Sequence, residues 1–219
     1  QGRRPSSSPG RRTPAFNKGG HYLGMDVVRV ATGEGFLADC RAMEAAITPD
    51  TVMLVGSAPN FPFGVIDPIE ELSRIAQARG LWLHVDACVG GYIAPFVRLL
   101  GEPVTAYDFS VAGVHSISAD LHKYGYAAKG ASTVLYRDVD RLKAQGFHFD
   151  QWPSGHMFTP TMAGTRPGGA IAAAWAVMNY LGVEGYCSRR APSWILGGRW
   201  RRVSEISASR CSGVPRYRS

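Results

Sequence analysis

Residues 52–87, VMLVGSAPNFPFGVIDPIEELSRIAQARGLWLHVDA, decide the fold of this chain. The segment opens on a short apolar run at 52–56 and closes on another at 81–87. Both runs are typical of buried strands in a parallel sheet. Between them, apolar positions recur on one face of a helix that we expect to end at Gly80, namely Ile69, Leu72, Ile75 and Ala76. The segment therefore predicts a βαβ unit with a right-handed crossover.

The start of the predicted helix carries three matching signals. Asp67 is a suitable N-cap residue, Pro68 suits the first helical position, and Glu70 stands in the place of a capping-box acid. We therefore expect the Asp67 side chain to cap this helix.

The alternation of strand and helix continues toward the C-terminus. Further strands are predicted at 114–118 and 132–136. An alanine-rich helix at about 169–181 follows a stretch rich in proline and glycine. The fold class that we expect is α/β, a layered domain with a mostly parallel sheet flanked by helices.

Charge and composition separate the two ends of the chain from its middle. The chain has 219 residues and a formal net charge of +7. Residues 187–219 contain eight arginines and one acid, whereas residues 21–186 hold 11 basic and 16 acidic side chains, a net charge of −5. We predict a disordered or linker-like tail at 1–15, a folded domain at 16–186 and a poorly patterned tail at 187–219. No nucleic-acid partner is expected, because the basic charge belongs to the tails.

The positions of the cysteines and the hydropathy of the sequence indicate the cellular compartment that we expect. The four cysteines, at 40, 88, 187 and 211, form no CxxC pair and no His/Cys cluster with the spacing of a metal site. No apolar run is long enough to span a membrane, and no apolar segment follows the N-terminal arginines as in a secretory signal. We expect free thiols, no metal and a cytoplasmic protein.

Asp86 is the first candidate for chemistry. In the expected strand it shares a face with His84 and stands at the carboxyl end, where ligand sites of open α/β sheets lie. A buried carboxylate needs a partner. The protonated ring nitrogen of pyridoxal 5'-phosphate is such a partner, and keeping it charged makes the ring an electron sink. On this segment alone, an Asp86 that caps the following turn at Gly90 and Gly91 is an alternative.

Lys123 follows another predicted strand, in the loop ADLHKYGYAAKG at 119–130. It lies between His122 and a Tyr-Gly-Tyr stretch, which is unlike the setting of a solvated surface lysine. An aldehyde cofactor needs an amine whose pKa is lowered by burial and neighbouring cations, so that the amine forms an imine. We predict that Lys123 carries the Schiff base and that His122 contacts the cofactor or its phosphate.

Two further positions suit anionic groups. Lys129 is too far from Lys123 in the loop to serve the same imine, but it suits an anionic group on a substrate; the alternative is an ordinary exposed lysine. Thr165 and Arg166 precede the alanine-rich helix, where a hydroxyl and backbone N–H groups make a phosphate cradle. A loop that only caps the helix is the alternative there.

Four strings in this sequence resemble the pyridoxal-phosphate-dependent group II decarboxylase superfamily and, within it, the sphingosine-1-phosphate lyase family in its soluble bacterial form. They are VGSAPNFPFGVIDPI, LWLHVDACVGGYIAPF, DFSVAGVHSISADLHKYGYAAKGASTVLYRD and AGTRPGGAIAAAWA. The resemblance covers roughly residues 16–186. It implies part of the large domain of a fold-type-I pyridoxal-phosphate enzyme, and a homodimer in the full-length family.

The resemblance also implies roles for individual residues. Lys123 would bind the cofactor aldehyde and Asp86 its ring nitrogen. Ala87 or Cys88 would lie near the ring. His122 and Thr165 would lie near the cofactor phosphate, Thr165 from across a dimer interface. Lys129 would bind the phosphate of a phosphorylated long-chain base, which is cleaved between C2 and C3 to a fatty aldehyde and phosphoethanolamine.

The sequence departs from the lyase pattern at several points. Phe61 stands where the family has a tyrosine near the substrate phosphate, and Thr13 stands where the family has a histidine that stacks on the pyridine ring. The phosphate loop upstream and the small C-terminal domain are missing, as expected from a truncation or a reading-frame error at both ends. Two alternatives stay open: an amino-acid decarboxylase, which needs Asp86 and Lys123 but no second phosphate site, and an inactive remnant.

Overall fold

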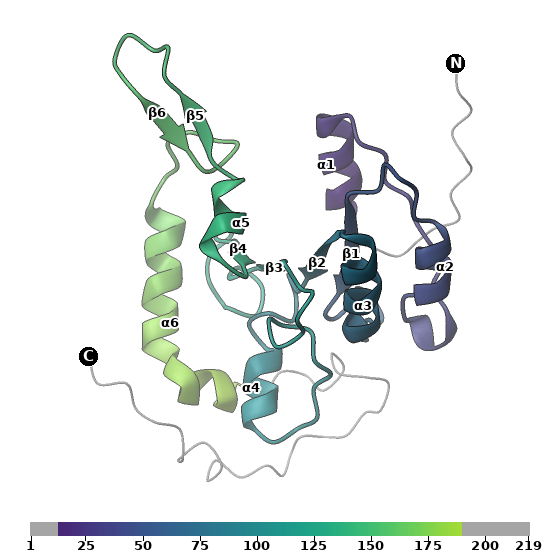
Figure 1. Ribbon diagram of the computed structural model, residues 1–219. Helices are drawn as coiled ribbons and strands as arrows, with labels where there is room; N and C mark the ends of the chain where they lie inside the picture. The colour runs from purple at the N-terminus through teal and green to yellow at the C-terminus, as the bar shows by residue number, and fades with distance from the viewer. Residues whose placement is uncertain (1–12, 190–219) are drawn as a thin grey trace.

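The computed structural model describes residues 13–189 (Figure 1). The tail predicted at 1–15 and the one at 187–219 lie almost wholly outside the described residues. A four-stranded sheet in the order β1-β2-β3-β4 organises the described part. Its strands are β1 (Met53–Ser57), β2 (Trp82–Asp86), β3 (Ser116–Ala119) and β4 (Thr133–Tyr136). The first three run parallel and β4 runs antiparallel to β3, which confirms the mostly parallel sheet.

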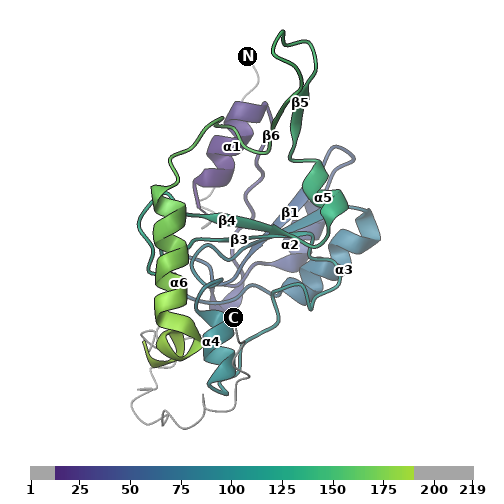
Figure 2. The ribbon, with the colours of Figure 1, turned by 90° about the vertical axis from the view of Figure 1, so that its left-hand side faces the viewer.

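Helices flank this sheet, and a separate hairpin stands away from it in both views (Figures 1 and 2). The helices are α1 (Ala15–Leu23), α2 (Cys40–Ala45), α3 (Ile69–Arg79), α4 (Ala94–Leu99), α5 (Val139–Lys143) and α6 (Gly169–Ser188), with a 3-10 turn at Glu34–Phe36. The hairpin pairs β5 (Phe147–Phe149) with β6 (Met157–Thr159). No helix within residues 13–189 is long and apolar enough to cross a membrane.

The main core lies between α3 and the first two strands. Ile69 and Leu72 of α3 and Leu83 of β2 are fully buried there. Gly56 of β1 makes the close approach possible, because a Cβ at this position would lie 2.5 Å from the Cδ1 atom of Ile69. The helix ends at Gly80, whose φ of 64° is the left-handed conformation that glycine adopts without strain. The predicted βαβ unit is confirmed.

The predicted cap of α3 is wrong. The helix begins at Ile69, and no side chain caps it. The carboxylate of Asp67 instead accepts hydrogen bonds from the backbone N–H of Ala38, over 2.9 Å, and of Ser57, over 2.8 Å. Asp67 is buried, so its two oxygens satisfy amides of the core rather than those of the first helical turn. Asp67 thus connects β1 to the segment before α2.

Candidate functional site

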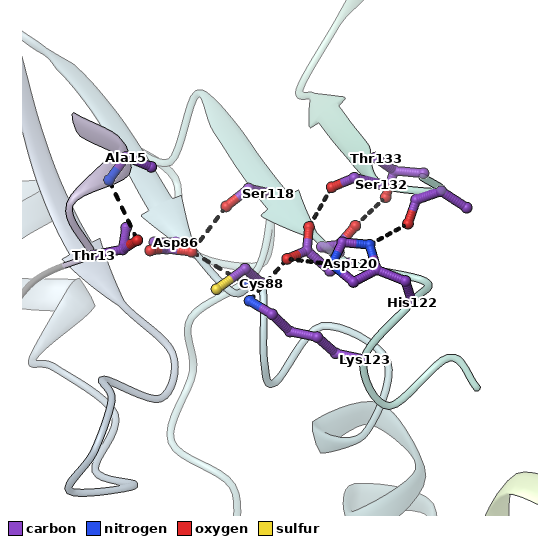
Figure 3. A network of polar contacts seen from close by, with 12 residues as sticks. Thr13, Ala15, Asp86, Cys88, Ser118, Asp120, His122, Lys123, Ser132 and Thr133 are labelled. Carbon is purple, nitrogen blue, oxygen red and sulfur yellow. Dashed lines mark hydrogen bonds and ion pairs between the residues drawn. The ribbon is translucent and has the colours of Figure 1, made fainter. Parts of the chain in front are cut away.

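The candidate site lies at the carboxyl ends of β2 and β3 (Figure 3). Asp86 is the last residue of β2, and it pairs in register with Ser118 of β3. The loop after β3 brings Asp120, His122 and Lys123 to the same place. Because carboxyl ends of parallel strands meet at one edge of a sheet, residues far apart in sequence converge here.

Asp86 is 7% exposed and is held by two hydrogen bonds. Its Oδ1 atom accepts from the backbone N–H of Cys88 and from the hydroxyl of Ser118, each over 3.1 Å. The bond from Cys88 is the turn cap that was the alternative role for this residue. Both donors use one oxygen, however, and within residues 13–189 no backbone amide or hydroxyl donates to Oδ2. Asp86 therefore caps the turn and still offers an acceptor to a ligand.

Cys88 lies between Asp86 and Lys123, whereas Ala87 is fully buried in the core. The Cys88 thiol interacts with both the carboxylate and the amine. Burial, followed by the charge of Asp86, raises the pKa of the thiol to about 11. The Cys88 side chain thus lies between Asp86, the predicted partner of the ring nitrogen, and Lys123, the predicted Schiff-base lysine.

Lys123 forms an ion pair that the sequence analysis did not foresee. Its Nζ atom lies 2.8 Å from Oδ2 of Asp120, and its side chain is 35% exposed. Burial lowers the pKa of Lys123, but the hydrogen bonds with Asp120 and Cys88 outweigh it and raise the pKa above its usual value. The expected lowering is therefore wrong for the protein without cofactor, because a carboxylate and not a cation faces the amine.

Asp120 is the residue of this cluster that we did not predict from the sequence. Its side chain is 13% exposed and accepts a hydrogen bond from the hydroxyl of Ser132 as well as from Lys123. Burial raises its pKa, and these donors together lower it below the usual range. The signal in the sequence was the spacing of three residues between Asp120 and Lys123, which brings such side chains together in a turn.

The side chain of His122 lies between Ala131 and Asp120. Its Nδ1 atom lies 2.8 Å from the carbonyl oxygen of Ala131, which can only accept, so Nδ1 carries a proton. Its Nε2 atom lies 3.8 Å from Oδ2 of Asp120. His122 thus lies at the site as predicted, beside Asp120.

Three predicted residues are not brought into this cluster. Phe61 is 76% exposed in the loop after β1, and Lys129 is exposed in the loop before β4. Thr165 is exposed in the bend that precedes α6, and no side chain caps that helix. The capping loop that we considered as the alternative for Thr165 is therefore not formed by the described residues, and the phosphate cradle stays a prediction.

The cluster fits pyridoxal 5'-phosphate at two of its functional groups. A buried carboxylate whose Oδ2 atom accepts no proton from a described backbone amide or hydroxyl suits a protonated ring nitrogen, and a primary amine within reach of the same thiol suits the aldehyde. His122 and Thr165 would bind the cofactor phosphate. Of these two residues, only His122 lies at the cluster.

Comparisons with known proteins show the family of this chain. The family model described as the pyridoxal-dependent decarboxylase conserved domain matches residues 17–192. Sphingosine-1-phosphate lyases from Oryza sativa subsp. japonica and Rattus norvegicus are each 49% identical over 78% of this chain. A probable L-aspartate decarboxylase from Pyrococcus abyssi is 37% identical over 78% of the chain.

Solved structures are also similar to this chain. A sphingosine-1-phosphate lyase from Burkholderia pseudomallei superposes with a TM-score of 0.79, at 44% identity over 82% of this chain and 41% of the other. A glutamate decarboxylase from Lactobacillus brevis shares the fold, with a TM-score of 0.70 at 22% identity. The chain spans about a third of the two lyase sequences, 32% and 30%, and 45% of the Pyrococcus relative. It belongs to the pyridoxal-dependent decarboxylase family, whose members use pyridoxal phosphate.

Proposed function

We propose that this chain is the cofactor-binding part of a carbon–carbon lyase that acts on a phosphorylated long-chain amino alcohol. The observation that carries the proposal is the cluster of Asp86, Cys88 and Lys123 at the carboxyl ends of β2 and β3. The identity of up to 49% to sphingosine-1-phosphate lyases supports the substrate class. The reaction breaks the C2–C3 bond and yields a fatty aldehyde and phosphoethanolamine.

Bound pyridoxal phosphate supplies a conjugated cationic ring that stabilises negative charge beside the substrate nitrogen. Asp86 would hold the ring nitrogen and favour its protonated form. Lys123 supplies the amine to which the cofactor attaches, and it must first leave its ion pair with Asp120 and lose a proton. When it is not bound to the cofactor, the amine of Lys123 would be the group that moves a proton at the reacting carbon or hydroxyl.

The substrate and the cofactor phosphate need cationic and hydroxyl partners. We assign Lys129 to the substrate phosphate, because its amine is exposed and lies six residues beyond Lys123 in the same loop. Phe61 lines the approach of the substrate without the hydroxyl of a tyrosine. His122 and Thr165 serve the cofactor phosphate, Thr165 from a second copy of the chain.

A homodimer and a cytoplasmic location belong to the same proposal. Apolar side chains of α6 stand in solvent, with Trp175 69% exposed and Ile171 56% exposed, and a partner surface would cover them. The described cysteines, Cys40, Cys88 and Cys187, form no disulfide with one another, which suits a reducing compartment.

An amino-acid decarboxylase is the second candidate, supported by the Pyrococcus relative. Incubation of the pyridoxal-phosphate-loaded chain with a phosphorylated sphingoid base and, separately, with acidic amino acids distinguishes the two. We expect phosphoethanolamine from the former. Carbon dioxide from the amino acids as sole product would contradict the lyase assignment, and turnover of neither substrate would favour an inactive remnant.

A further inference from the structure

A chain of hydrogen bonds runs along β2 and β3 and ends at Asp86. The indole Nε1–H of Trp82 donates to Oγ of Ser116 over 2.8 Å, and the same Oγ lies 2.8 Å from Nδ1 of His84. Nε2 of His84 lies 3.3 Å from Oγ of Ser118, which donates to Oδ1 of Asp86 over 3.1 Å. Five side chains thus connect the amino end of β2 to the candidate site.

The sheet itself produces this alignment. Side chains at alternate positions of a strand share a face, so Trp82, His84 and Asp86 of β2 point the same way. Ser116 and Ser118 of β3 share a face for the same reason. The register pairs His84 with Ser116 and Asp86 with Ser118, which sets each serine beside its partner.

The direction of hydrogen bonding is fixed at both ends of this row of side chains. An indole N–H can only donate and a carboxylate can only accept. Ser118 gives its single hydroxyl proton to Asp86, so it can only accept from His84, and Nε2 must carry the imidazole proton. Nδ1 then accepts from Ser116, whose oxygen also accepts from Trp82. With this tautomer every group in the chain is satisfied.

The surroundings of His84 keep the ring neutral. The side chain is buried, and burial lowers the pKa of His84 more than the charge of Asp86 raises it. The neighbours from β3 are the neutral hydroxyls of Ser116 and Ser118, and α1 contributes the ring of Phe16, 5.7 Å away between centroids. In a protonated ring Nδ1 would become a donor, and the hydroxyl proton of Ser116 would lose its acceptor.

We propose that His84 is a positioning residue, a neutral imidazole with its proton on Nε2 that directs the Ser118 hydroxyl at Asp86. This contact commits Oδ1 of Asp86 to the protein and leaves Oδ2 for the cofactor ring nitrogen. The second half of the proposal rests on the proposed function, whereas the tautomer of His84 does not.

The first experiment uses the full chain without cofactor. Nitrogen NMR of histidine-labelled protein reports the protonation of both ring nitrogens, and His84→Gln assigns the signal. We expect a neutral His84 with the proton on Nε2 at neutral pH. Ser118→Ala removes the acceptor at Nε2 and is expected to mix the two tautomers, and Ser118→Thr, which keeps a hydroxyl, is expected to restore the single one.

A matched control is available in Ser73, a buried serine of α3 that accepts a hydrogen bond from Gly113 N–H over 2.9 Å. Ser73→Ala should leave the His84 signals unchanged, although it also removes a buried hydroxyl. A wild-type His84 that carries its proton on Nδ1, or a Ser118→Ala protein with the wild-type His84 signals, would overturn the proposal.

The second experiment uses pyridoxal phosphate labelled with nitrogen-15 in the ring. In Ser118→Ala the carboxylate of Asp86 keeps only the hydrogen bond from the Cys88 N–H and is held less firmly, so the ring nitrogen should release its proton at a lower pH than in the wild type. Pyridoxal phosphate should also bind about 3- to 10-fold more weakly. Ser118→Thr should reverse both effects.

The outcomes of the two experiments separate the two claims. An unchanged or higher pH of proton release in Ser118→Ala would overturn the positioning role. If the chain takes up no cofactor at all, the proposed function fails, and the histidine spectra still decide the tautomer of His84.

Discussion

Lys123 and Asp120 form an ion pair with 2.8 Å between Nζ and Oδ2, and we expect this pair to control when the amine is available. Attachment of an aldehyde requires the neutral amine, and the hydrogen bonds with Asp120 and Cys88 raise the pKa of Lys123. The neutral fraction therefore grows as the pH rises toward the pKa of Lys123, and cofactor uptake should accelerate with it.

Replacement of Asp120 by asparagine should make cofactor uptake faster at neutral pH. The substitution removes the negative charge that holds the proton on Lys123, so the pH profile of the uptake rate should move to lower pH. Stopped-flow absorbance after mixing with pyridoxal phosphate measures the rate. Asp140→Asn is the control, because Asp140 pairs with Lys143 at the same spacing and distance on the surface. Equal profiles for wild type and Asp120→Asn would show that the pair has no such role.

Lys129 gives a second prediction at the level of a single residue. If its amine binds the substrate phosphate, Lys129→Ala should raise KM for a phosphorylated substrate by about tenfold or more, the worth of a charged hydrogen bond, and change kcat less. Steady-state kinetics with Lys143→Ala as the surface-lysine control measures this. A KM that is the same in both variants would remove Lys129 from the substrate site.

Asp67 does not cap α3 as its position in the sequence predicted, but binds two backbone amides elsewhere. Asp67→Ala should lower the free energy of unfolding by about 2–4 kcal/mol, because two buried amides lose a charged acceptor. Glu70→Ala should change it by no more than about 0.5 kcal/mol, since Glu70 is exposed and no side chain caps the helix. Denaturant titration of both variants tests this, and the opposite order would restore the capping interpretation.

The turn after β2 positions Cys88 and depends on Gly90. A Cβ at Gly90 would lie 2.2 Å from the carbonyl oxygen of Ala58, which is backbone and cannot move aside. Gly90→Ala should therefore cost about 1–3 kcal/mol of stability. Gly33→Ala serves as the control, because the nearest atom to its added Cβ is 3.7 Å away. Thermal unfolding followed by circular dichroism compares them, and equal stabilities would mean that the loop does not need the close approach.

The elements that could be predicted from the sequence are those with strong periodicity. The strands at 52–56 and 81–87 and the helix between them appear in the structure within one or two residues. The predicted helix at 169–181 is also present, but α6 continues past a bend at Gly182 to Ser188. Short helices such as α2 and α4 and the β5–β6 hairpin escaped prediction, because six or fewer residues show too little periodicity.

The candidate site was predictable in its residue types and not in its contacts. Alternation along β2 and the position of Lys123 after β3 indicated that Asp86 and the lysine converge. The sequence did not reveal that Asp120 holds Lys123 or that Ser118 holds Asp86, because these contacts depend on the register of β2 with β3. Thr165 and Lys129 lie away from the cluster, and their roles stay predictions.

At the scale of the whole molecule, the chain covers 41% of the lyase whose structure it resembles. The described part nevertheless contains a core around α3, β1 and β2 and the complete Asp86–Cys88–Lys123 cluster. We therefore expect cofactor attachment to depend on this cluster, and turnover to depend in addition on the residues that bind the two phosphate groups.

The most direct measurement of this central claim is the site of covalent attachment. The chain has four lysines, Lys18, Lys123, Lys129 and Lys143, so borohydride reduction with pyridoxal phosphate followed by peptide mass mapping identifies the modified residue. We expect modification at Lys123, loss of modification in Lys123→Ala and retention in Lys143→Ala. Modification spread over the other lysines, or equal uptake by wild type and Lys123→Ala, would contradict it.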